Sequence, residues 1–172
     1  MKRLLFLHLL KLSFLFVLLF SFNSVKAQQQ DNDYKKKVPP FHILLSNGDS
    51  LLSKQLKKNL PVMVVYFDPT CEHCQAFTRS LLEKIKSFNS VQIVYITYTP
   101  ISEVKKFEKD FSLKKYSNFK LGTEGDSFIV QKFYYVSKFP FIALYDKKGM
   151  LITFYRDPPS IETLIQQFET RS

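Results

Sequence analysis

The 172-residue sequence has little cysteine and glycine, with two and four of each, and no tryptophan. Two cysteines are too few for a small domain held together by several disulfides. They are also too few for a four-cysteine zinc site or a cysteine-ligated iron–sulfur cluster within one chain. Hydrophobic residues make up 45% of the sequence, which excludes a disordered chain. The length and composition therefore predict one globular domain of ordinary size.

The formal net charge of +10 is unevenly distributed. Residues 1–27 contain four basic residues and no acidic residue, and the remaining 145 residues carry 21 Lys and Arg against 15 Asp and Glu. No basic stripe with interleaved aromatic residues is present in the body of the chain. We therefore expect an ordinary solvated surface and no nucleic-acid partner.

Residues 1–27 have the three parts of a secretory signal peptide. Two basic residues precede the apolar run Leu4–Phe22, and Val25 and Ala27 stand before the predicted cut after Ala27. An uncleaved membrane anchor is the alternative, because this run approaches the length of a membrane-spanning helix. Lys11 divides the run and favours the signal peptide. We expect export to the periplasm, with membrane contact only if the segment is not cleaved.

The remaining chain divides into a polar tether, Gln28–Lys37, and a folded domain over residues 38–172. Apolar runs of strand length alternate with helical patterns in this domain. Strands are predicted at Phe41–Leu45, Val62–Phe67, Val91–Tyr98, Phe119–Leu121, Phe141–Tyr145 and Met150–Arg156. Helices are predicted over Cys71–Phe88, from Pro100 with Thr99 as N-cap, shortly before Val136, and from Ile161 with Ser160 as N-cap. This order predicts an α/β fold with a mixed central sheet and helices on both faces.

Both cysteines lie in the motif Cys71-Glu72-His73-Cys74, where a buried strand turns into a helix. A thiol at a helix N-terminus faces unpaired backbone N–H groups and the positive end of the helix dipole, which favour its thiolate. A thiolate attacks a disulfide, and a second cysteine one turn further along can resolve the mixed disulfide. We predict that Cys71 is the exposed nucleophile and Cys74 the buried resolving cysteine.

Three other roles for the cysteines are weaker. A disulfide that closes so short a loop would constrain little of the unfolded chain. A zinc site would need two further ligands, and after residue 27 the only histidines are His42 and His73. Covalent haem attachment needs histidine after the second cysteine, where this chain has Gln75.

The strand and dithiol of Val64–Gln75, together with Lys138–Phe141, resemble the thioredoxin superfamily. The similarity is greatest to the secreted TlpA/ResA-type thiol–disulfide oxidoreductases and related redoxin-domain proteins of the bacterial envelope, and it extends over Val38–Phe168. The resemblance implies a thioredoxin-like fold. It also implies a cis proline at Pro140 that lies against the dithiol, with the backbone of Phe139 binding the substrate chain.

The sequence departs from this family at one important position. The buried acid that handles the proton of the resolving cysteine would fall at Val65. Asp68 and Glu72 are the nearest candidates for the role, although Asp68 is more typical of a turn residue before proline. The related peroxidases need proline and threonine where Val64 and Asp68 stand, so peroxidase chemistry is not expected.

These features predict a thiol–disulfide oxidoreductase that acts on disulfides of other envelope proteins and needs no cofactor beyond its dithiol. A protonated His73 favours the Cys71 thiolate, whereas Glu72 disfavours it. Their partial cancellation predicts a reductase of intermediate to low potential, supplied with electrons by a membrane partner. The alternative is a thioredoxin-fold binding module, either a chaperone or an assembly factor that carries a soft metal ion on its cysteines.

Overall fold

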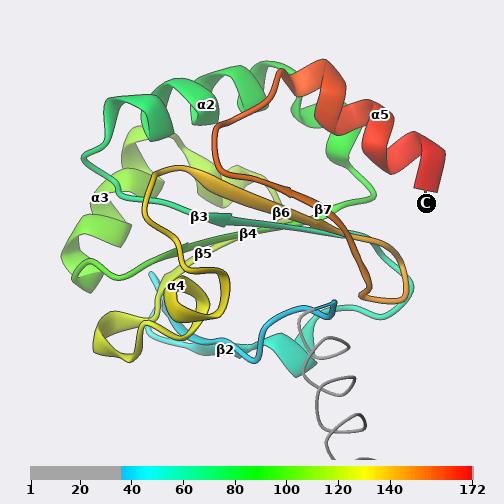
Figure 1. Ribbon diagram of the computed structural model, residues 1–172. Coiled ribbons are helices and arrows are strands. Elements are labelled where there is room, and N and C mark those ends of the chain that lie inside the picture. The colour runs from blue at the N-terminus through cyan, green and yellow to red at the C-terminus, as the bar shows by residue number, and fades with distance from the viewer. Residues whose placement is uncertain (1–35, 172) are drawn as a thin grey trace, which may run out of the picture. The chain divides into compact units, whose positions relative to one another are not determined.

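A mixed seven-stranded sheet runs through residues 36–171, which are the residues that the computed structural model describes (Figure 1). The predicted signal peptide and most of the predicted tether lie outside the described residues. Lys37, assigned to the tether, pairs with Met150 in an isolated antiparallel bridge. Among the described residues, no helix is long and apolar enough to cross a membrane.

The sheet has the strand order β2-β1-β5-β4-β3-β6-β7, and β3, β4 and β5 are parallel to one another. The other neighbouring pairs are antiparallel. The strands are β1 (His42–Leu45), β2 (Ser50–Leu52), β3 (Val62–Tyr66), β4 (Gln92–Thr97), β5 (Phe119–Thr123), β6 (Phe141–Tyr145) and β7 (Leu151–Tyr155). The helices are α2 (Glu72–Glu83), α3 (Ile101–Asp110), α4 (Ile129–Tyr134) and α5 (Ile161–Arg171).

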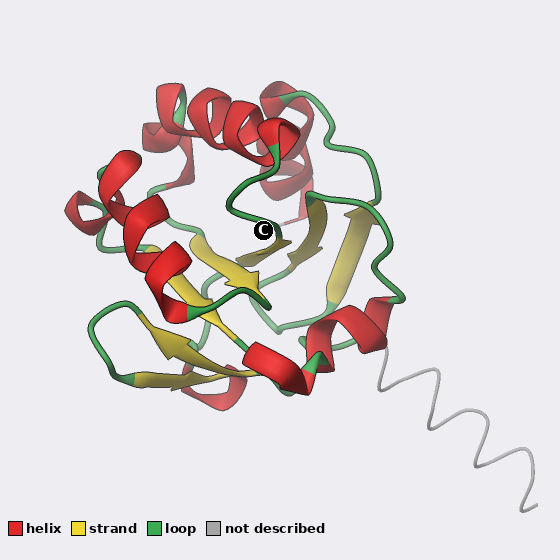
Figure 2. Cartoon of the chain, turned by 90° about the vertical axis from the view of Figure 1, so that its left-hand side faces the viewer, coloured by secondary structure: helices red, strands yellow, loops and turns green. Residues whose placement is uncertain are grey.

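Helices cover both faces of the sheet, as predicted (Figures 1 and 2). Alternate residues of a strand point to opposite faces, so β3 contributes to two cores. Val65 and Phe67 belong to the core under α2, α3 and α5, whereas Val64 and Tyr66 belong to the core beside α4. The crossovers β3–α2–β4 and β4–α3–β5 join parallel strands in the same order across the sheet, and right-handed crossovers therefore place α2 and α3 on one face.

The predicted helix over Cys71–Phe88 is shorter than expected. Helix α2 ends at Glu83, and a separate 3-10 turn covers Ile85–Phe88. The Lys84 backbone N–H donates to the Leu81 carbonyl at 3.2 Å, which is the tighter i to i−3 pattern of a 3-10 turn. The apolar stripe still reaches the core, because Leu81 and Phe88 are both fully buried.

The predicted start of the next helix, at Pro100 with Thr99 as N-cap, is one residue too early. Pro100 is the N-cap of α3, with extended backbone, and its carbonyl accepts the Glu103 N–H at 3.0 Å. No side-chain cap bond is present there, because the cap position is occupied by proline. At α5 the prediction is confirmed, since the Thr163 N–H donates to the Ser160 Oγ at 3.2 Å.

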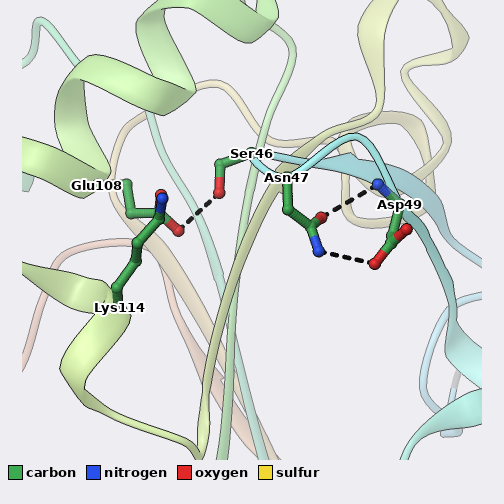
Figure 3. A network of polar contacts seen from close by, with 5 residues as sticks. All are labelled: Ser46, Asn47, Asp49, Glu108 and Lys114. Atoms are coloured by element: carbon green, nitrogen blue, oxygen red, sulfur yellow. Dashed lines mark hydrogen bonds and ion pairs between the residues drawn. The ribbon is translucent and has the colours of Figure 1, made fainter.

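Strands β1 and β2 form a hairpin that turns at Gly48. Gly48 adopts a φ of 94°, which favours glycine, and its N–H donates to the Leu45 carbonyl. Polar contacts tie this hairpin to α3 (Figure 3). The Ser46 Oγ donates to Glu108 at 2.7 Å, and Glu108 also pairs with Lys114 at 3.6 Å.

Candidate active site

Cys71 lies at the N-cap of α2, directly after the loop that leaves β3. Its extended backbone (φ −72°, ψ 120°) lets its carbonyl accept the Gln75 N–H at 3.0 Å, while its own N–H donates to the Asp68 carbonyl at 3.1 Å. Both cysteines are free thiols. The Cys71 side chain is partly exposed, as expected for an attacking thiol.

Cys74 lies one turn further along α2 and is 1% exposed. Burial raises the pKa of its thiol far above the ordinary value, and the nearby charges of Cys71 and Asp68 raise it further. A hydrogen bond from the Asp68 backbone opposes this rise without overcoming it. Cys74 is therefore a protonated thiol at neutral pH.

The loop before β6 lies against the dithiol. The Phe139–Pro140 peptide bond is cis, as the resemblance implies. The Cys71 thiol donates a long hydrogen bond to the Phe139 carbonyl oxygen, with 3.9 Å between sulfur and oxygen. The ring of Phe139 packs against those of Tyr66 and Tyr98, each with centroids 6.0 Å away. This packing holds the backbone of Phe139 beside the attacking sulfur.

Asp68 is a turn residue, as favoured, and it also organises the loop before Cys71. Its Oδ1 accepts from the Thr70 N–H at 2.8 Å and from the Thr70 Oγ1 at 2.7 Å. The Tyr98 hydroxyl donates to its Oδ2 at 2.8 Å. Partial burial raises the pKa of the Asp68 carboxyl, but these hydrogen bonds outweigh burial and hold it below the ordinary value.

Tyr98 was not identified from the sequence as a site residue. It follows β4, and it joins the dithiol loop to Phe139 through its hydroxyl and its ring. The carboxyl ends of parallel strands meet at one edge of a sheet. The position of Tyr98 just after β4, the strand next to β3, could therefore have identified it as a residue near the dithiol. The hydrogen bond to Asp68 is the main cause that raises the pKa of the Tyr98 hydroxyl, and burial raises it further.

Glu72 and His73 are exposed on the first turn of α2. His73 lines a surface hollow of about 450 Å³ with Phe77 and Pro159, between α2 and the start of α5. Among the described residues, neither the Glu72 nor the His73 side chain makes a hydrogen bond or ion pair. Any influence of either side chain on Cys71 therefore acts through charge across solvent.

The histidines and cysteines do not converge on a metal site. His42 is exposed on β1, at a distance along the sheet from the loop after β3. Within residues 36–171, no three or more His, Cys, Asp and Glu side chains are placed to hold a metal ion.

Comparisons with known proteins agree with this architecture. The family model described as Thioredoxin-like matches residues 59–151. The fold is similar to that of a secreted disulfide oxidoreductase of Mycobacterium tuberculosis that is homologous to DsbE of E. coli, with a TM-score of 0.63, 20% identity, and coverage of 76% of this chain and 96% of the other. StoA from Bacillus subtilis gives a TM-score of 0.57 at 17% identity, covering 76% and 98%.

A thiol-disulfide oxidoreductase from Bacteroides fragilis gives a TM-score of 0.63 at 15% identity, covering 77% of this chain and 98% of the other. No curated protein matches the sequence significantly. At these identities the solved structures establish the shared fold, and the family match extends over the dithiol, the cis proline and the sheet between them. The chain belongs to the thioredoxin-like family.

Proposed function

We propose that the protein is a thiol–disulfide oxidoreductase that acts on disulfides of other proteins through Cys71 and Cys74. The observation that supports this proposal is the arrangement of the two free thiols. One is partly exposed at the N-terminus of α2 and faces the Phe139 carbonyl at 3.9 Å, and the other is buried one turn further along. This difference in exposure supports the proposal that the two sulfurs act in successive steps.

In the first step, the Cys71 thiolate attacks one sulfur of a substrate disulfide. A bond forms between the two sulfurs, and the substrate's other sulfur leaves as a thiolate and takes a proton. The helix N-terminus and its unpaired N–H groups favour the attacking thiolate. The 3.9 Å distance between the Cys71 Sγ and the Phe139 carbonyl oxygen supports the proposal that the backbone of Phe139 binds the substrate chain.

In the second step, Cys74 attacks the Cys71 sulfur of the mixed disulfide. The Cys71–Cys74 disulfide forms, and the bond to the substrate sulfur breaks. The substrate leaves with both of its cysteines reduced, and the enzyme needs two electrons from a donor before it can react again.

Trapping of the mixed disulfide tests this assignment. Cys74→Ser removes the resolving thiol, so we expect this variant to accumulate mixed disulfides with envelope proteins, visible on non-reducing gels. Cys71→Ser is the matched control and should trap none. Trapping by Cys71→Ser alone would reverse the two roles, and trapping by neither variant would refute disulfide exchange as the function.

We further propose that electrons flow from the protein to its substrates. The charges that the exposed Glu72 and His73 side chains can carry are opposite in sign, which supports a dithiol of intermediate potential. We expect a reduction potential between about −270 and about −180 mV, the range from thioredoxin to disulfide isomerase. Equilibration of the pure protein with glutathione buffers measures it. A value near −120 mV would identify an oxidant instead.

A reductase in an oxidising compartment needs a membrane partner as its electron donor. Proteins of similar fold include the secreted M. tuberculosis oxidoreductase and an exposed lipoprotein thioredoxin of Streptococcus pneumoniae, so an envelope location is consistent with this architecture. Cell fractionation with mass spectrometry tests the location. We expect the protein in the periplasm with residues 1–27 removed, and recovery of the uncleaved chain from the cytoplasm would contradict the proposal.

A further inference from the structure

Two loops meet at the Cys71 sulfur. The dithiol loop, residues 67–71, connects β3 to α2, and the cis-proline loop, residues 135–140, connects α4 to β6. The long hydrogen bond from the Cys71 thiol to the Phe139 carbonyl oxygen joins them. A thiolate has no proton to donate, so this bond is lost in the form of Cys71 that attacks. The distance between the sulfur and the Phe139 backbone therefore needs another support in the reactive state.

Tyr98 contacts both loops. It follows β4, and its hydroxyl donates to the Asp68 Oδ2 of the dithiol loop at 2.8 Å. Its ring stacks on the Phe139 ring of the cis-proline loop, with 6.0 Å between centroids and 28° between planes. One side chain thus ties the loop that carries the nucleophile to the loop that lies against it.

Asp68 connects the Tyr98 hydroxyl to the nucleophile through short contacts. Its Oδ1 accepts from the Thr70 N–H at 2.8 Å and from the Thr70 Oγ1 at 2.7 Å. Its carbonyl oxygen accepts the Cys71 N–H at 3.1 Å. The position of Asp68 therefore fixes the backbone on which the attacking sulfur is carried.

The Tyr98 ring is held from a second side by Phe128, whose ring centroid lies 6.0 Å away. The Phe128 backbone has a φ of 49°, a conformation that is strained for a bulky residue. The Lys132 Nζ lies 5.7 Å from the centroid of the same ring. Strained residues persist where the surrounding structure fixes them. Tyr98 therefore has a fixed hydroxyl and a ring held between two other aromatic rings.

Tyr66 provides a comparison within the same cluster. Its ring also lies 6.0 Å from that of Phe139. Among the described residues, however, its hydroxyl makes no hydrogen bond to the dithiol loop. Tyr66 therefore supports one of the two loops, whereas Tyr98 joins them.

We propose that Tyr98 is a positioning residue that keeps the Cys71 sulfur and the Phe139 backbone at a fixed separation for attack on a polypeptide disulfide. This inference rests on the proposed function. In the attack, the Cys71 thiolate forms a bond to one substrate sulfur, and the bond between the two substrate sulfurs breaks. The leaving sulfur takes the electron pair of that bond and then a proton from solvent, while Tyr98 keeps its own proton.

Two probes separate positioning from general reactivity of the thiol. Insulin is a polypeptide disulfide that can bind along the Phe139 backbone, whereas hydroxyethyl disulfide has no peptide group. Reduced protein is mixed with each probe, and acid quenching, alkylation and mass spectrometry measure the loss of the free Cys71 thiol. Varying the insulin concentration gives the maximal rate constant and the half-saturating concentration.

Tyr98→Phe keeps the ring and removes the hydrogen bond to Asp68. We expect the maximal rate constant with insulin to fall roughly fivefold to tenfold, because the sulfur and the bound segment are no longer aligned. The half-saturating concentration and the rate with hydroxyethyl disulfide should each change by less than about twofold. Tyr98→Leu removes the support of Phe139 as well, so it should also raise the half-saturating insulin concentration by about fivefold.

Tyr145→Phe is the matched control. The Tyr145 hydroxyl is also buried, and its residue pairs with Val62 at the end of β3 remote from the dithiol loop. Both probes should react with this variant at the wild-type rate.

Asp68→Asn tests the other end of the hydrogen bond. It should lower the insulin rate relative to the hydroxyethyl disulfide rate by a factor similar to that of Tyr98→Phe. Adding Tyr98→Phe to it should lower this ratio no further, because both changes remove one interaction. If Tyr98→Phe does not fold, the ratio for Asp68→Asn decides the question.

The proposal is overturned if Tyr98→Phe reacts with insulin at the wild-type rate, or if it slows both probes by the same factor. It is also overturned if Tyr98→Phe keeps its full effect in the presence of Asp68→Asn. Failure of the proposed function would look different, because the wild-type protein itself would then not react with insulin.

Discussion

Helix α2 has two sides that differ in their surroundings. The side toward the sheet is buried and consists of Cys74, Phe77, Thr78 and Leu81. The other side faces solvent, with Glu72 and His73 in its first turn. Cys71 lies at the boundary, where its sulfur is reachable and its backbone is held by the loop after β3.

This difference shows how one motif gives two thiols of different chemistry. Cys71 depends on the helix end, the Phe139 carbonyl and the solvent. Cys74 depends on the core around it, because burial raises the pKa of its thiol and the groups of Cys71 and Asp68 act on it as well. Changes on the buried side should therefore alter stability and resolution, and changes on the exposed side only the rate of attack.

The largest effect is expected from opening the buried side. Leu81 is fully buried, so Leu81→Ala removes packed methyl groups and leaves a cavity. We expect a loss of about 2–5 kcal/mol in the free energy of unfolding, measured by urea denaturation. The neighbouring exposed Ser80→Ala is the control and should change it by about 0.5 kcal/mol or less. Equal losses would mean that α2 does not depend on its buried side.

The two thiols should differ strongly in alkylation. Cys74 is 1% exposed and its pKa is raised, so both access and ionisation are disfavoured. At about pH 8 we expect iodoacetamide to modify Cys71 roughly a hundredfold faster than Cys74. Peptide mass spectrometry measures both sites, and the urea-unfolded protein should show similar rates. Similar rates in the folded protein would remove the distinction between the two thiols.

A smaller loss of stability is expected from a change in the loop between β3 and α2. Asp68→Asn keeps an acceptor for Thr70 but loses the charge and the bond from Tyr98. The lowered pKa of Asp68 means that its contribution is present above the ordinary value of 3.8 and is lost as pH falls through the lower folded value. We expect a loss of about 1 kcal/mol in the free energy of unfolding at neutral pH.

Urea denaturation at about pH 7 and about pH 3 tests this pH dependence, since the difference between wild type and Asp68→Asn should shrink at the lower pH. Asp126→Asn, at an exposed aspartate, is the control and should show little difference at either pH. A difference that stays constant with pH would exclude the carboxylate as its source.

The smallest effects belong to the exposed side. Charges in solvent interact weakly, so we expect Glu72→Gln to speed Cys71 alkylation by about two- to threefold. His73→Asn should slow it by a similar factor, because a neutral amide replaces a side chain that can carry a positive charge. Both effects should diminish at high salt. Changes in the same direction would contradict the opposing roles assigned to these two residues.

The local parts of the site were predictable because their signals are local. A strand followed by two cysteines at the start of a helix identifies the dithiol, and the apolar period of α2 places Cys74 inside. The cis bond before Pro140 was expected from the resemblance. The end of α2 was not predictable, because the apolar stripe continues through Phe88 even though the backbone tightens into a 3-10 turn after Glu83.

Residue period and spacing along the chain are enough to predict the fold class, the position of the dithiol and which of its thiols is buried. The groups that surround those thiols depend on how distant segments pack together. Tyr98 reaches Asp68, and Tyr95 reaches Thr78 beneath Cys74, because parallel pairing brings β4 beside β3 in one register. A hydrogen bond between residues far apart in the chain depends on that register, and strand spacing alone leaves the register open.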